Sequence, residues 1–310
     1  MAPMVEPALP IRELRSGLPG FPPELAALGD APGSLWVRGE LPPPPRVAVV
    51  GARRADAYGL EAAAEIAAGL SRAGVAVVSG GAAGVDTAAL EASLRAGGRA
   101  VAVLGTGVDV AYPRANRALF ERLAAEGALL SEYPPGAPGR AYHFPRRNRL
   151  VAALSAAVVV VRAAPRSGSL ITARLARAQG RAVLAVPGPA GEELSAGCHA
   201  LLRQGARLVE GAADVLEVLG LGADAGQAAP PARAQEPALE PDERRLWEAL
   251  GPEACAVDSL VDRTGWSSAR VAALLLQMEC KGLVEHRPGM RYRRGAPAAT
   301  AGAGQGASQA

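Results

Sequence analysis

The sequence predicts an α/β protein, with an extended Rossmann-like, mostly parallel sheet followed by a small C-terminal winged-helix domain. Six short runs rich in Val and Ala recur in the first 220 residues, and they end in small-residue loops followed by helical patterns. Runs that are apolar throughout are typical of strands covered by helices on both faces. Because crossovers between parallel strands are right-handed, the loops after the strands gather at one sheet edge, where ligands bind.

The predicted sheet begins after a short N-terminal extension, residues 1–45, which ends in a run of four prolines. A helical period is clear in Ala62, Ile66 and Leu70, between the first two strands. The Rossmann-like domain is expected to span residues 46–220. Its strands are predicted at 47–50, 75–78, 100–104, 128–130, 156–161 and 182–186.

Residues 221–240 are rich in Ala, Pro and Gln and are predicted to form a linker. Residues 241–294 follow the order of a winged helix, and Ser267 can cap its third helix. Residues 295–310 are predicted to be a disordered tail. The winged-helix elements are expected to be helices at 242–250, 257–264 and 267–280 and wing strands at 284–287 and 290–294.

Charge is distributed unevenly along the chain. From Tyr133 to Gly191 the chain runs for 59 residues without an Asp or Glu, and this segment holds nine arginines. The whole chain has 33 basic and 30 acidic residues, so the remainder is slightly acidic. A concentrated cationic segment is expected to attract a polyanion. The alternative, arginines on solvated helix faces, is disfavoured because such faces normally mix both signs.

Several classes of protein are excluded by composition. The N-terminus lacks the pattern of a secretory signal, and the longest apolar stretch, Leu150 to Val161, is too short to span a bilayer. We therefore expect a cytoplasmic protein that does not enter a membrane. The three cysteines, Cys198, Cys255 and Cys280, form neither a metal-binding pattern nor a disulfide framework. We expect no metal and no cofactor.

A glycine-rich loop, Ser79-Gly80-Gly81-Ala82-Ala83-Gly84-Val85-Asp86, follows the second predicted strand and begins a helix. Backbone N–H groups and the helix dipole favour an anion at such a place, and glycine permits its close approach. The sequence disfavours hydrolysis of ATP through a phosphate-loop lysine, since the first lysine is Lys281. The alternative is a tight turn in which Asp86 stabilises the helix N-terminus. The predicted phosphate contacts are Ser79, Gly80, Gly81 and Gly84.

Further candidates follow other strands at the same predicted edge. Gly51 and Arg53 end the first strand, where a guanidinium can hold a phosphate through two hydrogen bonds. Arg53 lies nearer the strand end than Arg54 and is the better candidate. Arg114 begins the helix after the third strand. The run Ser167-Gly168-Ser169 begins another helix and forms either a second anion site or an ordinary hydroxyl cap.

The most specific string is Tyr-His-Phe-Pro-Arg-Arg-Asn-Arg at residues 142–149, which places an aromatic ring beside three arginines in a loop stiffened by proline. Single-stranded nucleic acid is bound by this combination, because a base stacks on the ring while guanidiniums hold the backbone. The alternatives are that Phe144 fills the core and that Arg149 makes a structural ion pair. The predicted contacts are Phe144, Arg146, Arg147, Asn148 and Arg149.

Taken together, these motifs resemble the DNA-processing protein A (DprA/Smf) family, in the family's order, from about Leu35 to Leu219. The chain departs from the family at Ala52, where Ser is usual, and at His199, where Asn is common. The shared motifs are Gly51-Ala52-Arg53, Ser79 to Asp86, Tyr112-Pro113, Ser131-Glu132, Phe144 to Arg149, Ser167 to Leu170 and Ala185-Val186-Pro187-Gly188.

The resemblance implies a protein that binds single-stranded DNA, forms a homodimer and loads the RecA recombinase onto incoming strands in natural transformation. It implies a binding protein and not an enzyme. It also implies that Arg53 holds backbone phosphate and that Ser79 to Gly84 lines a phosphate pocket. The same resemblance implies that the backbone and bases of the DNA strand are contacted by Phe144, Arg146, Arg147 and Arg149.

The chief alternative is an enzyme that cleaves the base from a nucleoside monophosphate, because such phosphoribohydrolases have a similar glycine-rich loop. They need a carboxylate in a Gly-Gly-x-Gly-Thr-x-x-Glu motif, and the corresponding run here, Asp86-Thr87-Ala88-Ala89, lacks it. Asp86 or Glu132 could substitute, yet no second acid or metal site supports the chemistry.

A third possibility is a transcription regulator whose winged helix reads duplex DNA. The predicted recognition helix offers few base-reading side chains beyond Arg270 and Gln277. The wing arginines Arg291, Arg293 and Arg294 could contact phosphate, or the whole module could serve protein contacts.

Overall fold

The computed structural model describes residues 9–221, 239–250, 255–281, 283–287 and 291–294. The chain divides into two compact units, residues 1–226 and 227–310. The predicted tail and nearly all of the predicted linker lie outside the described residues, and the predicted domain boundaries stay predictions.

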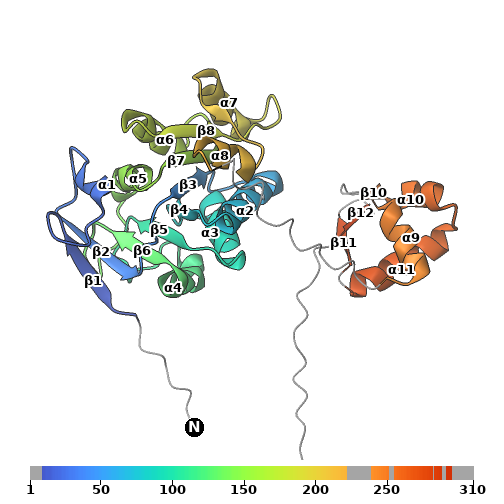
Figure 1. Ribbon diagram of the computed structural model, residues 1–310. Coiled ribbons are helices and arrows are strands. Elements are labelled where there is room, and N and C mark those ends of the chain that lie inside the picture. Colours follow the sequence, from blue (N-terminus) through green and yellow to red (C-terminus); the bar gives the residue numbers. More distant parts are fainter. Residues whose placement is uncertain (1–8, 222–238, 251–254, 282, 288–290, 295–310) are drawn as a thin grey trace, which may run out of the picture. The chain divides into compact units, whose positions relative to one another are not determined.

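The first unit is built on one nine-stranded sheet in the order β1-β2-β6-β5-β4-β3-β7-β8-β9 (Figure 1). The seven strands from β6 to β9 in this order are mutually parallel, which confirms the predicted fold class. All six predicted strands are present. The parallel strands are β3 (Arg46–Gly51), β4 (Ala76–Ser79), β5 (Ala100–Leu104), β6 (Ala128–Ser131), β7 (Ala157–Val161), β8 (Ala182–Ala185) and β9 (Arg207–Leu208).

The N-terminal extension adds two strands that the sequence did not predict. β2 (Ser34–Gly39) pairs antiparallel with β6, and β1 (Ile11–Arg15) pairs antiparallel with β2. The extension therefore forms one edge of the sheet.

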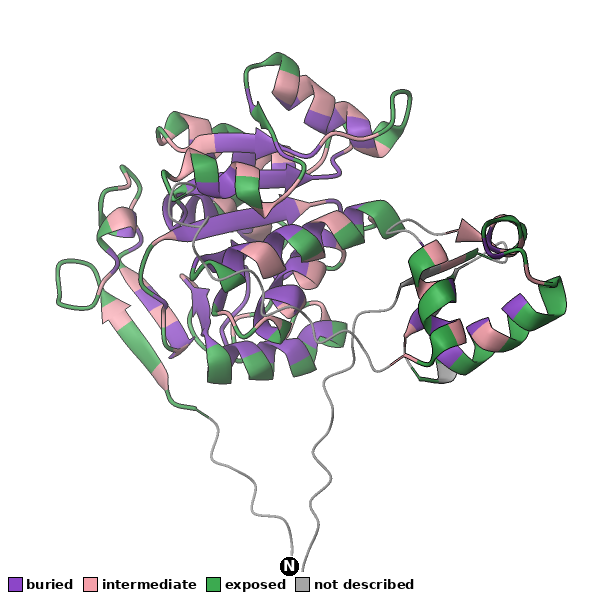
Figure 2. Cartoon of the chain, turned by 45° about the vertical axis from the view of Figure 1, so that its right-hand side comes forward, coloured by how far each residue is buried: buried purple, intermediate pink, exposed green. Residues whose placement is uncertain are grey.

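Helices cover both faces of the sheet, as the continuous apolar strands predict (Figure 2). On β3, Val47 and Val49 pack on one side with α2 (Ala57–Arg72), α3 (Val85–Arg95), α4 (Arg117–Glu126) and α8 (Ala212–Val218). Ala48 and Val50 pack on the other side with α1 (Pro23–Ala26), α5 (His143–Ala153), α6 (Ser169–Ala178) and α7 (Glu193–Arg203). This alternation is the two-residue period of a strand buried on both faces.

The strand order reverses at β3, which lies between β4 and β7. After β3 the chain adds β4, β5 and β6 on one side and then returns to place β7 on the other. In open α/β sheets such a reversal leaves a crevice outside the carboxyl ends of the two strands, and ligands bind there.

Residues 143–153 form α5, so the string that contains Phe144 lies mostly in the first turns of a helix. The sequence predicts a loop stiffened by Pro145 here, and that prediction is wrong. Pro145 is the third helical residue, however, and the first N–H groups of a helix have no intrahelical acceptor, so proline removes no hydrogen bond there.

The second unit has the predicted order of a winged helix. Its three-stranded sheet has the order β10-β12-β11, and the side chain of Ser267 accepts a hydrogen bond from the Arg270 N–H at 3.4 Å, as predicted for the cap. The predicted turn between the wing strands, residues 288–289, lies outside the described residues. The elements are α9 (Pro241–Ala249), β10 (Cys255–Ala256), α10 (Val257–Thr264), α11 (Ser268–Cys280), β11 (Val284–Arg287) and β12 (Arg291–Arg294).

Candidate nucleic-acid interface

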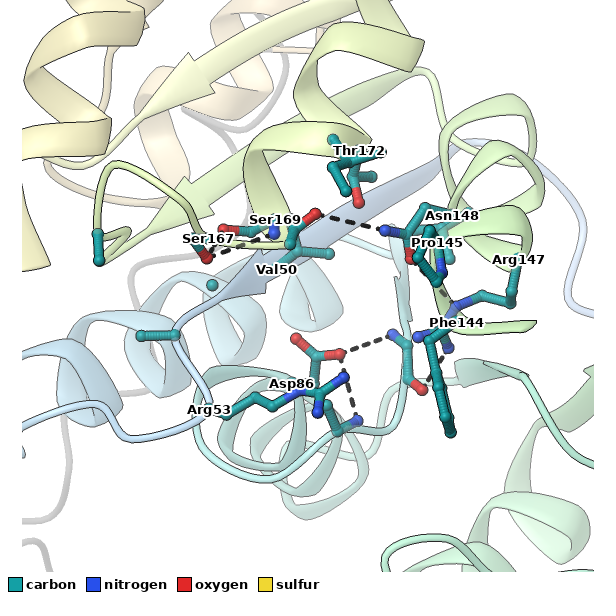
Figure 3. Close-up of a pocket in the computed structure, with 18 of the residues that line it drawn as sticks. Val50, Arg53, Asp86, Phe144, Pro145, Arg147, Asn148, Ser167, Ser169 and Thr172 are labelled. Carbon is teal, nitrogen blue, oxygen red and sulfur yellow. Dashed lines mark hydrogen bonds between the residues drawn. The ribbon is translucent and has the colours of Figure 1, made fainter. Parts of the chain in front are cut away.

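A cavity of about 720 Å³ opens where the strand order reverses (Figure 3). Its walls are the loop after β3, the glycine-rich loop after β4, the loop after β7 and the first turns of α5. The position agrees with the ligand site predicted from the topology.

Most of the predicted contact residues meet in this cavity. Ser79, Gly81 and Gly84 belong to the glycine-rich loop but do not line the cavity. Arg146 and Arg149 lie on α5 and do not line it either, since Arg146 is exposed outside the cavity and Arg149 is buried. Arg114 lies elsewhere. The predicted residues that line the cavity are Gly51, Arg53, Gly80, Phe144, Arg147, Asn148, Ser167, Gly168 and Ser169.

At the mouth of the cavity, a guanidinium lies over an aromatic ring. The Arg53 guanidinium carbon is 5.7 Å from the centroid of the Phe144 ring, and the Tyr112 ring is 5.1 Å from the same centroid. Arg53 and Tyr112 are exposed and Phe144 is half-buried. A cation and aromatic rings therefore lie together, which is a combination suited to single-stranded nucleic acid. The cation is Arg53, however, and not one of the three arginines that follow Phe144 in the sequence.

The glycines of the loop after β4 are required by its close packing. Gly84 has φ +81°, and a Cβ there would lie 2.3 Å from the Ala52 carbonyl oxygen. Gly81 has φ +68°, another conformation that favours glycine. The Ser79 hydroxyl donates to the Val49 carbonyl at 2.7 Å, so it holds β4 to β3.

Inside this loop, Asp86 accepts hydrogen bonds from the loop's own backbone. Its Oδ2 accepts from Gly80 N at 3.1 Å and from Ala82 N at 3.3 Å. Asp86 is only 6% exposed, and burial raises the pKa of its carboxyl, although Arg147 and the two N–H groups oppose the rise. The geometry is that of the alternative in which Asp86 stabilises the start of the helix.

Arg147 is 5% exposed and spans the base of the cavity. Its guanidinium donates to the carbonyl oxygens of Gly80 and Val103, and so ties α5 to the ends of β4 and β5. Burial lowers the pKa of Arg147 to about 10, and the nearby Asp86 partly opposes this. The side chain holds the cavity floor in place and presents little of its charge to solvent.

Arg149 makes the structural ion pair that the sequence left open as an alternative. Its Nε is 2.8 Å from Asp30 Oδ2 and its Nη2 is 2.6 Å from Glu132 Oε2. Arg146 is exposed, with its Nε 3.1 Å from Glu132 Oε1. Glu132 therefore joins two arginines of α5, and Arg149 fixes that helix to the N-terminal extension.

Arginines of the acid-free segment, residues 133–191, thus pair with carboxylates that lie outside that segment. Besides Arg149, the buried Arg162 pairs with Asp56, the N-cap residue of α2, and with Glu192 before α7. Part of the positive charge counted along the sequence is consequently neutralised inside the fold. The polyanion-attracting charge must come from the exposed arginines.

Two such arginines lie at the cavity, namely Arg54, which the sequence analysis ranked below Arg53, and Arg166, which it did not consider. Both line it and are exposed, and within the described residues Arg53, Arg54 and Arg166 have no carboxylate partner within salt-bridge distance. Arg166 directly precedes the Ser167-Gly168-Ser169 run, and this adjacency could have identified it as a candidate from the sequence.

The loop after β7 is held to α5 at the cavity wall. Asn148 Nδ2 donates to the Gly168 carbonyl oxygen at 3.3 Å. The hydroxyls of Ser167 and Ser169 are 2.8 Å apart, and Ser167 Oγ accepts from Ser169 N at 3.4 Å. Ser167 therefore contacts the first N–H of α6 from the position before the N-cap Gly168, and it is not an ordinary N-cap.

Arg114 lines a separate hollow of about 600 Å³ together with Arg38, Arg117 and Glu121. Arg38 and Glu121 form a pair, with Nη1 and Oε1 3.1 Å apart. Arg114 and Arg117 are exposed at its rim. The structure does not bring Arg114 into the cavity that contains Arg53 and Phe144.

In the second unit, Arg270 is engaged within the domain. Its guanidinium carbon lies 4.5 Å from the Trp266 ring centroid, and its Nη2 is 2.5 Å from Asp242 Oδ2. The exposed positions of α11 include Ala269, Ala272 and Leu276, which offer no hydrogen bonds to base edges, and Gln277, the other base-reading candidate.

Among the residues that the structure describes, no cluster of three or more His, Cys, Asp or Glu side chains could hold a metal ion. Over the same residues, none of the helices combines the length and apolar character needed to cross a membrane.

Comparison with known proteins gives a consistent result. Residues 14–220 match the family model described as DNA recombination-mediator protein A, and residues 230–290 match that of the DprA winged helix domain. A putative DNA processing protein DprA of Mycobacterium tuberculosis is 46% identical over 287 residues, which are 91% of this chain and 72% of that protein.

Two solved structures share the fold. DNA processing protein A of Streptococcus pneumoniae superposes with a TM-score of 0.65 at 42% identity, covering 67% of this chain and 74% of that one. DNA processing protein A of Helicobacter pylori, described by its single-stranded DNA binding mode, gives a TM-score of 0.62 at 31% identity, covering 68% and 96%.

Proposed function

The chain belongs to the DNA recombination-mediator protein A (DprA/Smf) family, and from this premise we propose that it binds single-stranded DNA in the cavity at the carboxyl ends of β3 and β7. The Helicobacter pylori relative, whose description names that activity, supports the proposal.

One observation carries the proposal: three exposed arginines border the same cavity as the Phe144 ring, and none of the three has a carboxylate partner in the described part of the chain. They are Arg53, Arg54 and Arg166. Guanidiniums neutralise backbone phosphates and release their counterions, whereas an aromatic face accepts any base. A duplex keeps its bases stacked inside the helix, so this pairing favours an unpaired strand.

The contacts divide by chemistry. Arg53, Arg54 and Arg166 hold phosphates, and the rings of Phe144 and Tyr112 stack on bases. Arg146 and Arg114 are exposed outside the cavity and extend the contact with the strand, although Arg146 also pairs with Glu132. Backbone groups at Gly51 and at the run 167–169 complete the wall.

Arg147, Asn148 and Arg149 act by positioning. Arg147 fixes α5, and with it Phe144, to the ends of β4 and β5. Asn148 fixes the helix to the loop after β7, and Arg149 fixes it to the N-terminal extension. Ser79, Gly80, Gly81 and Gly84 shape the loop that faces them.

We further propose that the bound strand is passed to the RecA recombinase in natural transformation, that the protein acts as a homodimer in the cytoplasm, and that it is not an enzyme. Family membership supports these points. The cleavage of nucleoside monophosphates is disfavoured because Asp86, the carboxylate nearest to the loop, is buried and already accepts two backbone hydrogen bonds.

The test is the affinity of the full chain for oligo-dT and for random duplex of equal length at two ionic strengths. We expect the single strand to bind more tightly at both. If about three phosphates are neutralised, the log-log salt slope is about −2, from ~−0.7 per phosphate. Equal affinity for duplex would refute the proposal, and release of free base from nucleoside monophosphates would favour the enzyme.

A further inference from the structure

The glycine-rich loop after β4 surrounds a carboxylate of its own chain. Asp86 is the second residue of α3, directly after the loop, and its Oδ2 accepts from Gly80 N and Ala82 N (Figure 3). In phosphate-binding loops of this kind, N–H groups at a helix N-terminus point at a phosphate oxygen. Here an aspartate oxygen takes that place.

The carbonyl oxygens of the loop also have partners within the protein. Arg147 donates to the Gly80 carbonyl, Asn116 Nδ2 donates to the Gly81 carbonyl at 3.1 Å, and Thr87 Oγ1 donates to the Ala82 carbonyl at 2.7 Å. Two N–H groups and three carbonyl oxygens of the loop are therefore already hydrogen-bonded within the protein. Binding a phosphate at Gly80 and Ala82 would require breaking two hydrogen bonds and placing a dianion beside a carboxylate.

The cationic groups of the cavity lie elsewhere. Arg53, Arg54 and Arg166 are exposed around it, while the Arg147 guanidinium is buried against the Gly80 carbonyl. A phosphodiester of a strand can be held by those exposed groups without entering the loop. A phosphate monoester, which gains its affinity in glycine-rich loops from backbone N–H groups, has none to bind at Gly80 and Ala82.

We infer that Asp86 occupies the place a phosphate group takes in phosphate-binding loops, and thereby makes the cavity selective for nucleic-acid strands over free nucleotides and inorganic phosphate. Asp86 is a specificity-determining residue in this view. The selectivity for strands rests on the proposed function, whereas the occupancy of the loop is testable by itself.

Replacement of the side chain tests the occupancy. Asp86→Ala removes the carboxylate, so the N–H groups of Gly80 and Ala82 lose their acceptor and Arg147 loses its neighbouring carboxylate. Inorganic phosphate should therefore bind in its place and stabilise the variant. At a phosphate concentration ten times its Kd, the melting temperature should rise by about 3–6 °C. Chloride at the same ionic strength is the control. Thymidine monophosphate should act as phosphate does.

Wild-type protein and Asp86→Asn are the matched comparisons, because both keep an oxygen at this position. Neither should show a saturable rise above the chloride control. A rise in wild-type equal to that of Asp86→Ala would overturn the inference, because the loop would then be open to phosphate with Asp86 present.

The removal of Asp86 leaves Arg147 buried without its counter-charge, so stability is measured together with binding. If Asp86→Ala is unfolded without phosphate, refolding on addition of phosphate but not of chloride supports the inference. Asp86→Ser supplies a second cavity-forming variant. Failure of both variants to respond to phosphate contradicts it.

Oligo-dT binding by the wild-type protein separates this inference from the proposed function. If wild-type protein does not bind oligo-dT, the proposed function fails while the phosphate response of Asp86→Ala can still be observed. If it binds oligo-dT and Asp86→Ala gains no phosphate response, only the role of Asp86 is wrong.

Discussion

The Arg53 guanidinium carbon lies 5.7 Å from the centroid of the Phe144 ring, although 91 positions separate the two residues in the sequence. Arg53 comes from the loop after β3, and Phe144 from the first turn of α5. The reversal of strand order in the sheet opens the crevice that both residues line. One nucleotide of a bound nucleic-acid strand could therefore contact both the cation and the stacking face.

Arg53→Ala should weaken oligo-dT binding and lower the magnitude of the log-log salt slope by about 0.7, because one fewer phosphate is neutralised. Affinity measured by fluorescence anisotropy at four or more salt concentrations checks both. Arg174→Ala is the matched control, since Arg174 is an exposed arginine of the same acid-free segment on α6 that does not line the cavity. Equal losses in the two variants would show that total charge, and not the cavity, determines binding.

Phe144→Ala should cost on the order of 1–3 kcal/mol of binding free energy and leave the salt slope nearly unchanged, because stacking releases no counterions. Phe144 also packs closely on Gly105, where an added Cβ would lie 2.9 Å from the ring. Phe144→Leu therefore controls for packing, and Phe144→Tyr should restore binding. A flattened slope in Phe144→Ala equal to that of Arg53→Ala would contradict this division between stacking and charge.

Strands and helices that show a local pattern could be predicted from the sequence, whereas those that depend on distant partners could not. Strands such as β7, Ala157–Val161, are apolar at every position and were recognisable alone. β1, Ile11–Arg15, has three charged residues among five, and its strand form depends on pairing with β2. The start of α5 was hidden because Pro145 is tolerated only in the first turn of a helix.

The roles of individual arginines were harder to predict for the same reason. Within the string at residues 146–149, sequence alone could not separate the exposed Arg146 from the buried Arg147 and Arg149. The partner Asp30 is 119 positions from Arg149, and the acceptors of Arg147 lie at the ends of other strands. Burial and pairing are properties of the fold and left no local signal.

Arg149→Met should lower the free energy of unfolding by about 3–5 kcal/mol, because it leaves the Glu132 carboxylate, whose side chain is only 7% exposed, without its closest cation. Urea denaturation followed by circular dichroism measures the change. Arg166→Ala should instead stay within about 0.5 kcal/mol of wild-type stability, since its side chain is exposed, and should weaken oligo-dT binding. The reverse pattern would assign the structural role to Arg166 and the binding role to Arg149.

Asp86 should give the protein a pH-dependent stability that Asp86→Asn lacks. Burial raises the pKa of Asp86 in the folded state, so the folded protein keeps a proton that the unfolded chain loses near the ordinary pKa of about 3.9. Its contribution to stability is therefore fully present below that pH and is lost as pH rises through the folded pKa. The groups that oppose the shift are Arg147, the N–H groups of Ala82 and Gly80, and the Ser79 hydroxyl.

The difference in unfolding free energy between wild-type and Asp86→Asn, measured by urea denaturation from pH 3.5 to 8, should accordingly move against wild-type as pH increases. The neutral amide cannot titrate, so every other group cancels in the difference. A carbon-13 titration of the Asp86 carboxyl gives the folded pKa independently. A difference that is flat across this range would mean that the opposing groups cancel the effect of burial on the pKa, and one that favours wild-type as pH rises would mean that they outweigh it.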